Sequence, residues 1–150
     1  MHAYALPPWY GLTLTALVCG AAFWKGGRDE QFAAGGMLLG WLATLVLRDP
    51  RWLGIQWGAL GADIFFLVVL LAIVLRTERY WPLAAAAFQL LAVVTHLARM
   101  VDHGLNGWTY ATAGIIWTQL VLLALGVGVW GAWRARRQLS VNEAPDPARR

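Results

Sequence analysis

The residue with the clearest chemical potential is Asp63, a carboxylate in the middle of an apolar run that covers residues 53–75. An ionised carboxylate inside a bilayer is costly, so such a residue rarely faces lipid and usually has a polar partner. The best candidate partners are His96 and Arg99, which lie one helical turn apart near the end of the next apolar run. The sequence therefore predicts a polar site inside the membrane.

Two amides extend this candidate site. Gln89, His96 and Arg99 recur at helical spacing and share one face of the fourth run, whereas Gln119 on the last run reaches about the depth of Asp63. Buried Asp and His side chains can exchange protons, so the site could relay protons or ions or hold a small ligand. The alternative is structural: Asp63 pairs with His96 or Arg99 and fixes the register of two helices.

A second polar cluster is expected at the outer ends of the runs, where Asp49, Asp102 and His103 could approach one another. These side chains could in principle act as an acid and a base, or bind a metal. Asp102 and His103 lack a third ligand nearby in the sequence, so we predict no metal site. The plain alternative is a solvated loop.

Cofactor motifs are weak in this chain. His96 and His103 would lie about 10 Å apart on one helix face, too far to ligate one metal from both sides. A pigment or haem held by His96 alone remains an alternative. The glycines at 126, 128 and 131 are spaced like a dinucleotide-binding motif, but no strand precedes them. We therefore predict no cofactor.

The composition places the chain in the membrane class. Its 150 residues are 59% hydrophobic and 13% charged, and they include ten Trp, most of them near the ends of apolar runs where indole rings prefer to lie. The net charge of +4 comes from basic residues scattered in pairs, which argues against nucleic acid as a partner. The single Cys19 excludes an internal disulfide.

Five apolar runs are long enough for membrane helices, so we predict an all-α bundle with five transmembrane helices in one domain, residues 1–133. The runs cover residues 9–24, 31–47, 53–75, 81–101 and 109–133. The links between them are short, so neighbouring helices should be antiparallel. The first run follows no Lys or Arg, which favours a retained helix over a signal peptide. Residues 134–150 are basic and polar, and we expect a disordered cytoplasmic tail there.

The distribution of Lys and Arg predicts the orientation in the membrane. In a five-helix arrangement one side would hold nine basic residues and the other three: Lys25, Arg28, Arg76, Arg79, Arg134, Arg136, Arg137, Arg149 and Arg150 against Arg48, Arg51 and Arg99. Positive residues collect on the cytoplasmic side. The N-terminus is then outside and the C-terminus is cytoplasmic.

Small residues recur at four-residue spacing on two of the runs. Gly36 and Gly40 form one such face, and Gly54, Gly58 and Ala62 form another. Faces of this kind let helix backbones approach closely, either within one chain or between copies in a homo-oligomer.

Parts of the last two runs resemble known sequences. Residues 80–83 (YWPL), 88–91 (FQLL), 95–102 (THLARMVD) and 110–117 (YATAGIIW) are similar to small membrane proteins of uncharacterised function in alphaproteobacteria. The resemblance implies a bacterial cytoplasmic (inner) membrane and no particular activity.

The sequence favours a non-catalytic subunit or oligomeric scaffold of a larger membrane complex, because small-residue faces and interfacial Trp occur without a recognisable catalytic set. Its partners would be the lipid bilayer and other membrane subunits or further copies of the chain. The first alternative is a small transporter or channel for protons, ions or a small solute, using Asp63, His96 and Arg99. The last is an intramembrane enzyme or a subunit that binds a pigment through one histidine.

Overall fold

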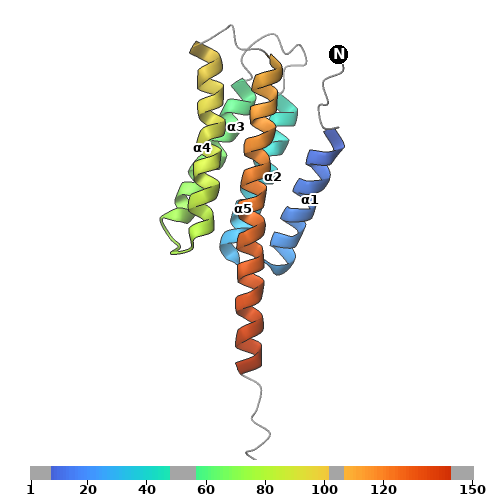
Figure 1. The fold of residues 1–150 in the computed structure, drawn as a ribbon, viewed down its shortest axis with the longest axis vertical. Coiled ribbons are helices and arrows are strands. Elements are labelled where there is room, and N and C mark those ends of the chain that lie inside the picture. The colour runs from blue at the N-terminus through green and yellow to red at the C-terminus, as the bar shows by residue number, and fades with distance from the viewer. Residues whose placement is uncertain (1–7, 48–56, 102–106, 143–150) are drawn as a thin grey trace, which may run out of the picture.

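The structure is a computed structural model that describes residues 8–47, 57–101 and 107–142. All regular structure in these ranges is helical, which confirms the predicted helical bundle. The five helices follow one another up and down along a common axis (Figure 1), and they are α1 (Pro8–Lys25), α2 (Arg28–Leu47), α3 (Trp57–Val74), α4 (Tyr80–Val101) and α5 (Gly107–Asn142).

The helix ends follow local chemistry. Helix α2 starts before the predicted residue 31, because Asp29 and Glu30 in its first turn complement the positive end of the helix dipole. Gly26 and Gly27 separate α1 from α2. A Cβ at Gly26 would clash with the Ala22 carbonyl oxygen, so only glycine fits this turn.

The last helix continues past the predicted end at residue 133. Helix α5 runs on to Asn142, so the expected disorder is wrong for residues 134–142. Arg, Gln and Leu are good helix formers, and stacking adds to this: the Arg137 guanidinium lies 4.0 Å from the centre of the Trp133 ring. Figure 1 shows this part of α5 alone below the other helices, and residues 143–150 lie outside the described ranges.

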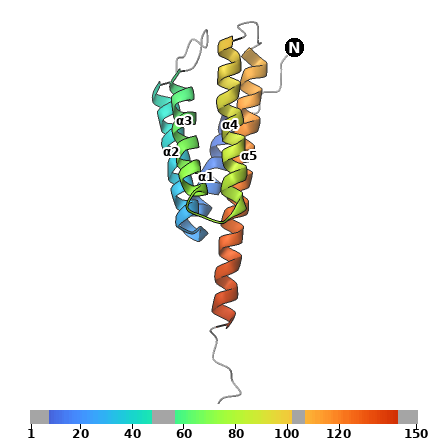
Figure 2. The same ribbon diagram turned by 90° about the vertical axis from the view of Figure 1, so that its left-hand side faces the viewer.

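The helices form a closed ring. Each packs against the next along the chain, α1 also packs against α5, and a further contact joins α2 to α5. In Figure 2, which is turned by 90°, α2 and α3 lie side by side, as do α4 and α5. The ring therefore encloses an interior that all five helices can line.

Four of the described helices are long and apolar enough to cross a membrane, namely α2, α3, α4 and residues 108–140 of α5. The outer surface of the bundle is rich in exposed leucine, valine and phenylalanine side chains. A surface of this kind suits lipid and would be unstable in water. The chain is thus a helical membrane protein. Helix α1 is not among the four candidates, and its crossing remains a prediction.

The packed core occupies the half of the bundle that contains the C-terminal end of α1. Leu70 on α3 and Leu122 and Leu125 on α5 are almost fully buried there, together with Cys19 and alanines of α1, α2 and α4. Tight burial of these side chains closes the interior at this end.

Glycines bring α2 against α3 within the chain. A Cβ at Gly36 would come within 3.1 Å of Val69, and one at Gly40 would contact the carbonyl oxygen of Ala62. The small-residue faces around Gly36, Gly40 and Ala62 thus serve packing inside one molecule. Gly58 lies against Leu47, whereas Gly54 falls outside the described residues.

A buried carboxylate joins the turns at the core end. Glu30 is 0% exposed; its Oε1 accepts hydrogen bonds from Arg79 Nη1 at 2.8 Å and Trp81 Nε1 at 3.0 Å, and its Oε2 accepts one from the Gly27 amide at 2.7 Å. Arg136 of α5 also donates to the Gly26 carbonyl. These bonds connect the α1–α2 turn to the α3–α4 connection and to α5. The sequence suggested only a polar link around Glu30.

Candidate functional site

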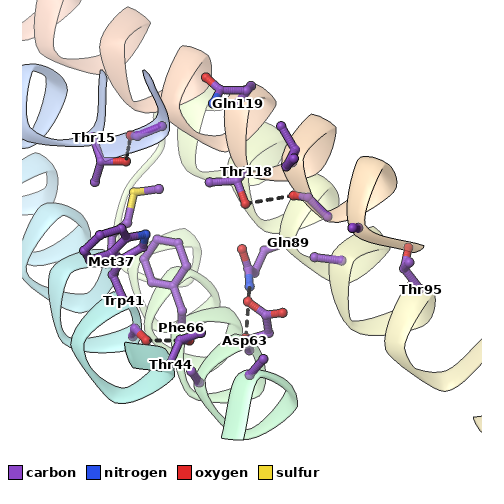
Figure 3. Close-up of a pocket in the computed structure, with 18 of the residues that line it drawn as sticks. Thr15, Met37, Trp41, Thr44, Asp63, Phe66, Gln89, Thr95, Thr118 and Gln119 are labelled. Carbon is purple, nitrogen blue, oxygen red and sulfur yellow. Dashed lines mark hydrogen bonds between the residues drawn. The ribbon is translucent and has the colours of Figure 1, made fainter. Parts of the chain in front are cut away.

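A cavity of about 410 Å³ lies in the half of the bundle opposite the packed core. All five helices line it: residues 10–15 of α1, 37–44 of α2, 59–66 of α3, 89–96 of α4 and 110–119 of α5 contribute. Figure 3 shows Asp63 and Gln89 pointing toward each other within it, with Met37, Trp41 and Phe66 grouped nearby and Thr118 contributed by α5.

Asp63 is held by two residues of α4. Gln89 Nε2 donates to Asp63 Oδ1 at 2.9 Å and also lies 3.2 Å from the Asp63 backbone oxygen. His96 Nε2 lies 2.9 Å from Asp63 Oδ2. The side chain of His96 is only 11% exposed, whereas that of Asp63 is 31% exposed. The carboxylate is thus fixed in position and still accessible from the cavity.

Tyr110 of α5 completes a row of hydrogen-bonded side chains, which we call the Asp63 row: Gln89, Asp63, His96 and Tyr110. Its hydroxyl lies 2.6 Å from His96 Nδ1, and the two rings meet edge to face at 85° with their centres 5.3 Å apart. When Asp63 is a carboxylate it can only accept, so His96 Nε2 carries the proton and Nδ1 accepts from the Tyr110 hydroxyl. The four side chains come from α3, α4 and α5.

This row can take up one proton without breaking. An added proton makes His96 an imidazolium, whose Nδ1–H then donates to the Tyr110 oxygen while Nε2–H still donates to Asp63. The Tyr110 hydroxyl hydrogen becomes free to point elsewhere. The geometry can therefore couple protonation of His96 to the hydrogen-bonding character of the cavity wall.

The threonine hydroxyls in the lining bond to their own helices. Each donates to the backbone carbonyl one turn earlier, at 2.8–2.9 Å: Thr15 to Gly11, Thr44 to Gly40, Thr95 to Leu91 and Thr118 to Gly114. Thr95 additionally accepts the indole N–H of Trp117 at 3.0 Å. These bonds satisfy the hydroxyl hydrogens within the protein.

The structure brings together Asp63, His96 and Gln89, and Gln119 lines the same cavity. Arg99 is placed differently from the predicted pairing. Its guanidinium lies 5.8 Å from the centre of the Tyr110 ring, and the described partners of Asp63 are Gln89 and His96. The imidazole of His96 is hydrogen-bonded to the second carboxylate oxygen.

The outer cluster cannot be placed, because Asp49, Asp102 and His103 fall outside the described residues. Within the ranges that the structure describes, no group of three or more His, Cys, Asp or Glu side chains could hold a metal ion. Both ring nitrogens of His96 are in hydrogen bonds. A pigment ligated by His96 would have to displace Asp63 or Tyr110, which argues against that alternative.

Sequence reasoning missed Tyr110 and Glu30. Tyr110 could have been found, since residues at similar distances from the link between two antiparallel helices tend to meet, and His96 and Tyr110 flank such a link. Glu30 had no comparable signal, because acidic residues at the start of a helix are common and usually exposed.

Comparisons with protein-family models, with curated proteins and with solved structures find no match to this chain. The resemblance to alphaproteobacterial membrane proteins therefore stays a prediction.

Proposed function

We propose that the protein is a membrane-embedded binding protein for a small molecule, and that the cavity between its five helices is the binding site. The volume of about 410 Å³ falls in the range of small-molecule sites, roughly 300–1,000 Å³. Apolar side chains such as Met37 and Phe66 share the lining with a few polar groups. This mixture is typical of ligand sites, where polar groups fix orientation and apolar surface supplies affinity.

The observation that carries the proposal is the partial exposure of Asp63. A carboxylate that served only to lock helix register would be expected to be packed on all sides, since an accessible charge within a membrane is costly. Here Gln89 and His96 orient both carboxylate oxygens, yet 31% of the side chain remains exposed. An oriented and accessible acceptor inside a cavity favours ligand binding.

We further propose the membrane setting predicted from the sequence. Most of the described basic residues lie at the core end of the bundle: Lys25, Arg28, Arg76, Arg79 and the arginines in the last part of α5. Because positive residues collect on the cytoplasmic side, this end of the bundle would be cytoplasmic. With α1 as a fifth crossing, the N-terminus is outside and the cavity lies in the outer half. The proposed location is the bacterial cytoplasmic membrane.

A substitution that fills the cavity tests the proposal. Gly114 lines the cavity and nothing lies within 4 Å of a Cβ built there, so Gly114→Met should fold normally and occupy the binding space. Gly131→Met on the same helix also meets open space but lies outside the cavity, and it serves as the control. Mass spectrometry of small molecules that co-purify in mild detergent should find one in the wild type and Gly131→Met, and lose it in Gly114→Met. Identical small-molecule content in all three proteins would refute the proposal.

Transport is a second candidate function, in which the molecule bound in the cavity also crosses the membrane. The cavity ends against the packed core around Leu70, Leu122 and Leu125, so a solute that entered from the outer half would need the helices to move before it could leave on the other side. Uptake into liposomes would show such a movement. The role as a subunit or scaffold also stays a prediction, and stoichiometric partners in the intact mass of the purified complex would support it.

A further inference from the structure

The N–H and O–H groups of the Asp63 row are already used within the protein. Gln89 Nε2 donates to Asp63 Oδ1 and approaches its backbone oxygen. With Asp63 ionised and His96 neutral, His96 donates to Asp63 Oδ2 and Tyr110 donates to His96. In this state the row has no hydrogen left for a ligand. It presents the remaining lone pairs of Asp63 and of the Tyr110 oxygen.

The threonines around the cavity have the same character. Thr15, Thr44 and Thr118 donate to backbone carbonyls of their own helices, so each keeps only acceptor capacity toward the interior. The other donors among the lining side chains are the Tyr10 hydroxyl, the Trp41 indole and the Gln119 amide, and both Tyr10 and Gln119 can accept as well, so acceptors predominate in the lining. A ligand that satisfies this lining must bring donors of its own.

We infer that the ligand is an organic cation, a protonated amine on a compact apolar body. This inference rests on the proposed function and names its ligand class. An ammonium group supplies up to three N–H donors and a positive charge, which suits a carboxylate oriented in a medium of low dielectric constant. The rings of Tyr10 and Trp41 line the same cavity, and aromatic rings favour a cation over their faces.

The charged and titratable groups near the site come from four helices, and Asp63 is the acidic side chain of the cavity lining. Helix α3 contributes Asp63, α4 contributes His96 and Arg99, α5 contributes Tyr110 and α1 contributes Tyr10, while the lining residues of α2 carry no ionisable group. Arg99 is not among the lining residues, and its guanidinium lies against the Tyr110 ring.

The test uses three probes that share a phenyl ring and differ in the head group: 2-phenylethylammonium, 2-phenylethanol and phenylacetate. Binding is measured by calorimetry on the full chain in nanodiscs of zwitterionic lipid. The ammonium should bind about ten-fold or more tightly than the alcohol, because both can donate a hydrogen bond to Asp63 but only the ammonium also brings a positive charge to the carboxylate. Phenylacetate should bind most weakly, since the lining would repel it.

The Asp63→Asn variant removes the negative charge of the site and keeps nearly the same side-chain shape. The asparagine amide can donate to His96 Nε2, and His96 can then donate through Nδ1 to Tyr110, so the row keeps its bonds with their direction reversed. The ammonium should lose its advantage in this variant, while the alcohol should bind within about two-fold of its wild-type affinity, which also shows that the cavity is intact. Glu78→Gln removes an exposed carboxylate outside the cavity and should leave all three affinities unchanged.

Three results would overturn the inference: equal binding of the ammonium and the alcohol to the wild type, tighter binding of phenylacetate, or an ammonium preference that survives Asp63→Asn. None of them decides whether the cavity binds a small molecule at all. The comparison of Gly114→Met with Gly131→Met decides that separately.

Discussion

At the scale of single residues, the carboxylates of Asp63 and Glu30 lie in opposite halves of the bundle and have different roles. Asp63 is fixed by Gln89 and His96 but partly open to the cavity, whereas Glu30 is 0% exposed and its bonds to Arg79, Trp81 and the Gly27 amide occupy both oxygens. An enclosed carboxylate with both oxygens bonded contributes to stability. An oriented but accessible one is available to a ligand.

We expect Glu30→Gln to lower the free energy of unfolding by about 1–3 kcal/mol, because the hydrogen bonds from Arg79 and Trp81 to a charged acceptor are replaced by weaker bonds to an amide oxygen. The Gln NH₂ group would also face the Gly27 amide, a donor against a donor. Reversible unfolding in mixed detergent micelles measures this loss. Glu78→Gln, at an exposed position, is the control, and an equal effect of the two substitutions would contradict a stabilising role for Glu30.

At the scale of helices, two glycine positions show how closely the elements approach. Gly36 of α2 packs on Val69 and Phe66 of α3, and Gly128 of α5 packs on Trp81 of α4, where a Cβ would lie 2.7 Å from the indole ring. The indole cannot retreat freely, because its Nε1 is bonded to Glu30. The close contact between α4 and α5 therefore requires a glycine, which has no side chain, at position 128.

Gly128→Ala should destabilise the protein by about 1–3 kcal/mol through overpacking against Trp81. Gly131→Ala provides the matched control, since it lies one turn along the same helix and a Cβ there meets nothing within 4 Å. That substitution should be neutral or should stabilise the helix slightly, because alanine is the better helix former. Thermal denaturation of the two variants side by side measures the difference, and equal melting temperatures would show that α4 can move away from α5.

At the scale of the whole molecule, the two ends of the bundle differ in chemistry. The core end carries most of the described basic residues and the Glu30 bonds, while the other half holds the cavity. Helix α5 also extends beyond the other helices at the core end (Figures 1 and 2). If positive charge sets the orientation, the extension lies in the cytoplasm and the cavity in the outer half.

Cysteine labelling tests that orientation. In a Cys19→Ala background, Thr109→Cys places a thiol at an exposed position near the cavity end, and Ser140→Cys places one at an exposed position on the extension of α5. A membrane-impermeant maleimide should label Thr109→Cys in intact cells and should reach Ser140→Cys only after the membrane is permeabilised. The reverse pattern would place the cavity in the cytoplasmic half.

Much of this architecture could be predicted from the sequence because it depends on local pattern. Apolar runs of bilayer length between short polar links determine how many helices form and that neighbours are antiparallel, and helical spacing alone places Gln89 and His96 on one face. The cost of a carboxylate in lipid predicts that Asp63 faces the protein. The prediction of disorder directly after Trp133 is wrong because Arg and Gln, although polar, are also good helix formers.

Only the tertiary structure decided which polar residues meet and what surrounds them. Asp63 bonds to His96 and Gln89 and not to Arg99, Tyr110 completes the row, and Glu30 is buried, because these outcomes depend on the rotation of each helix about its axis. Side-chain packing between helices sets that rotation, and no single run of sequence contains it. The cavity has the same origin: it exists where five helices fail to fill the space between them, which is a property of the assembled bundle.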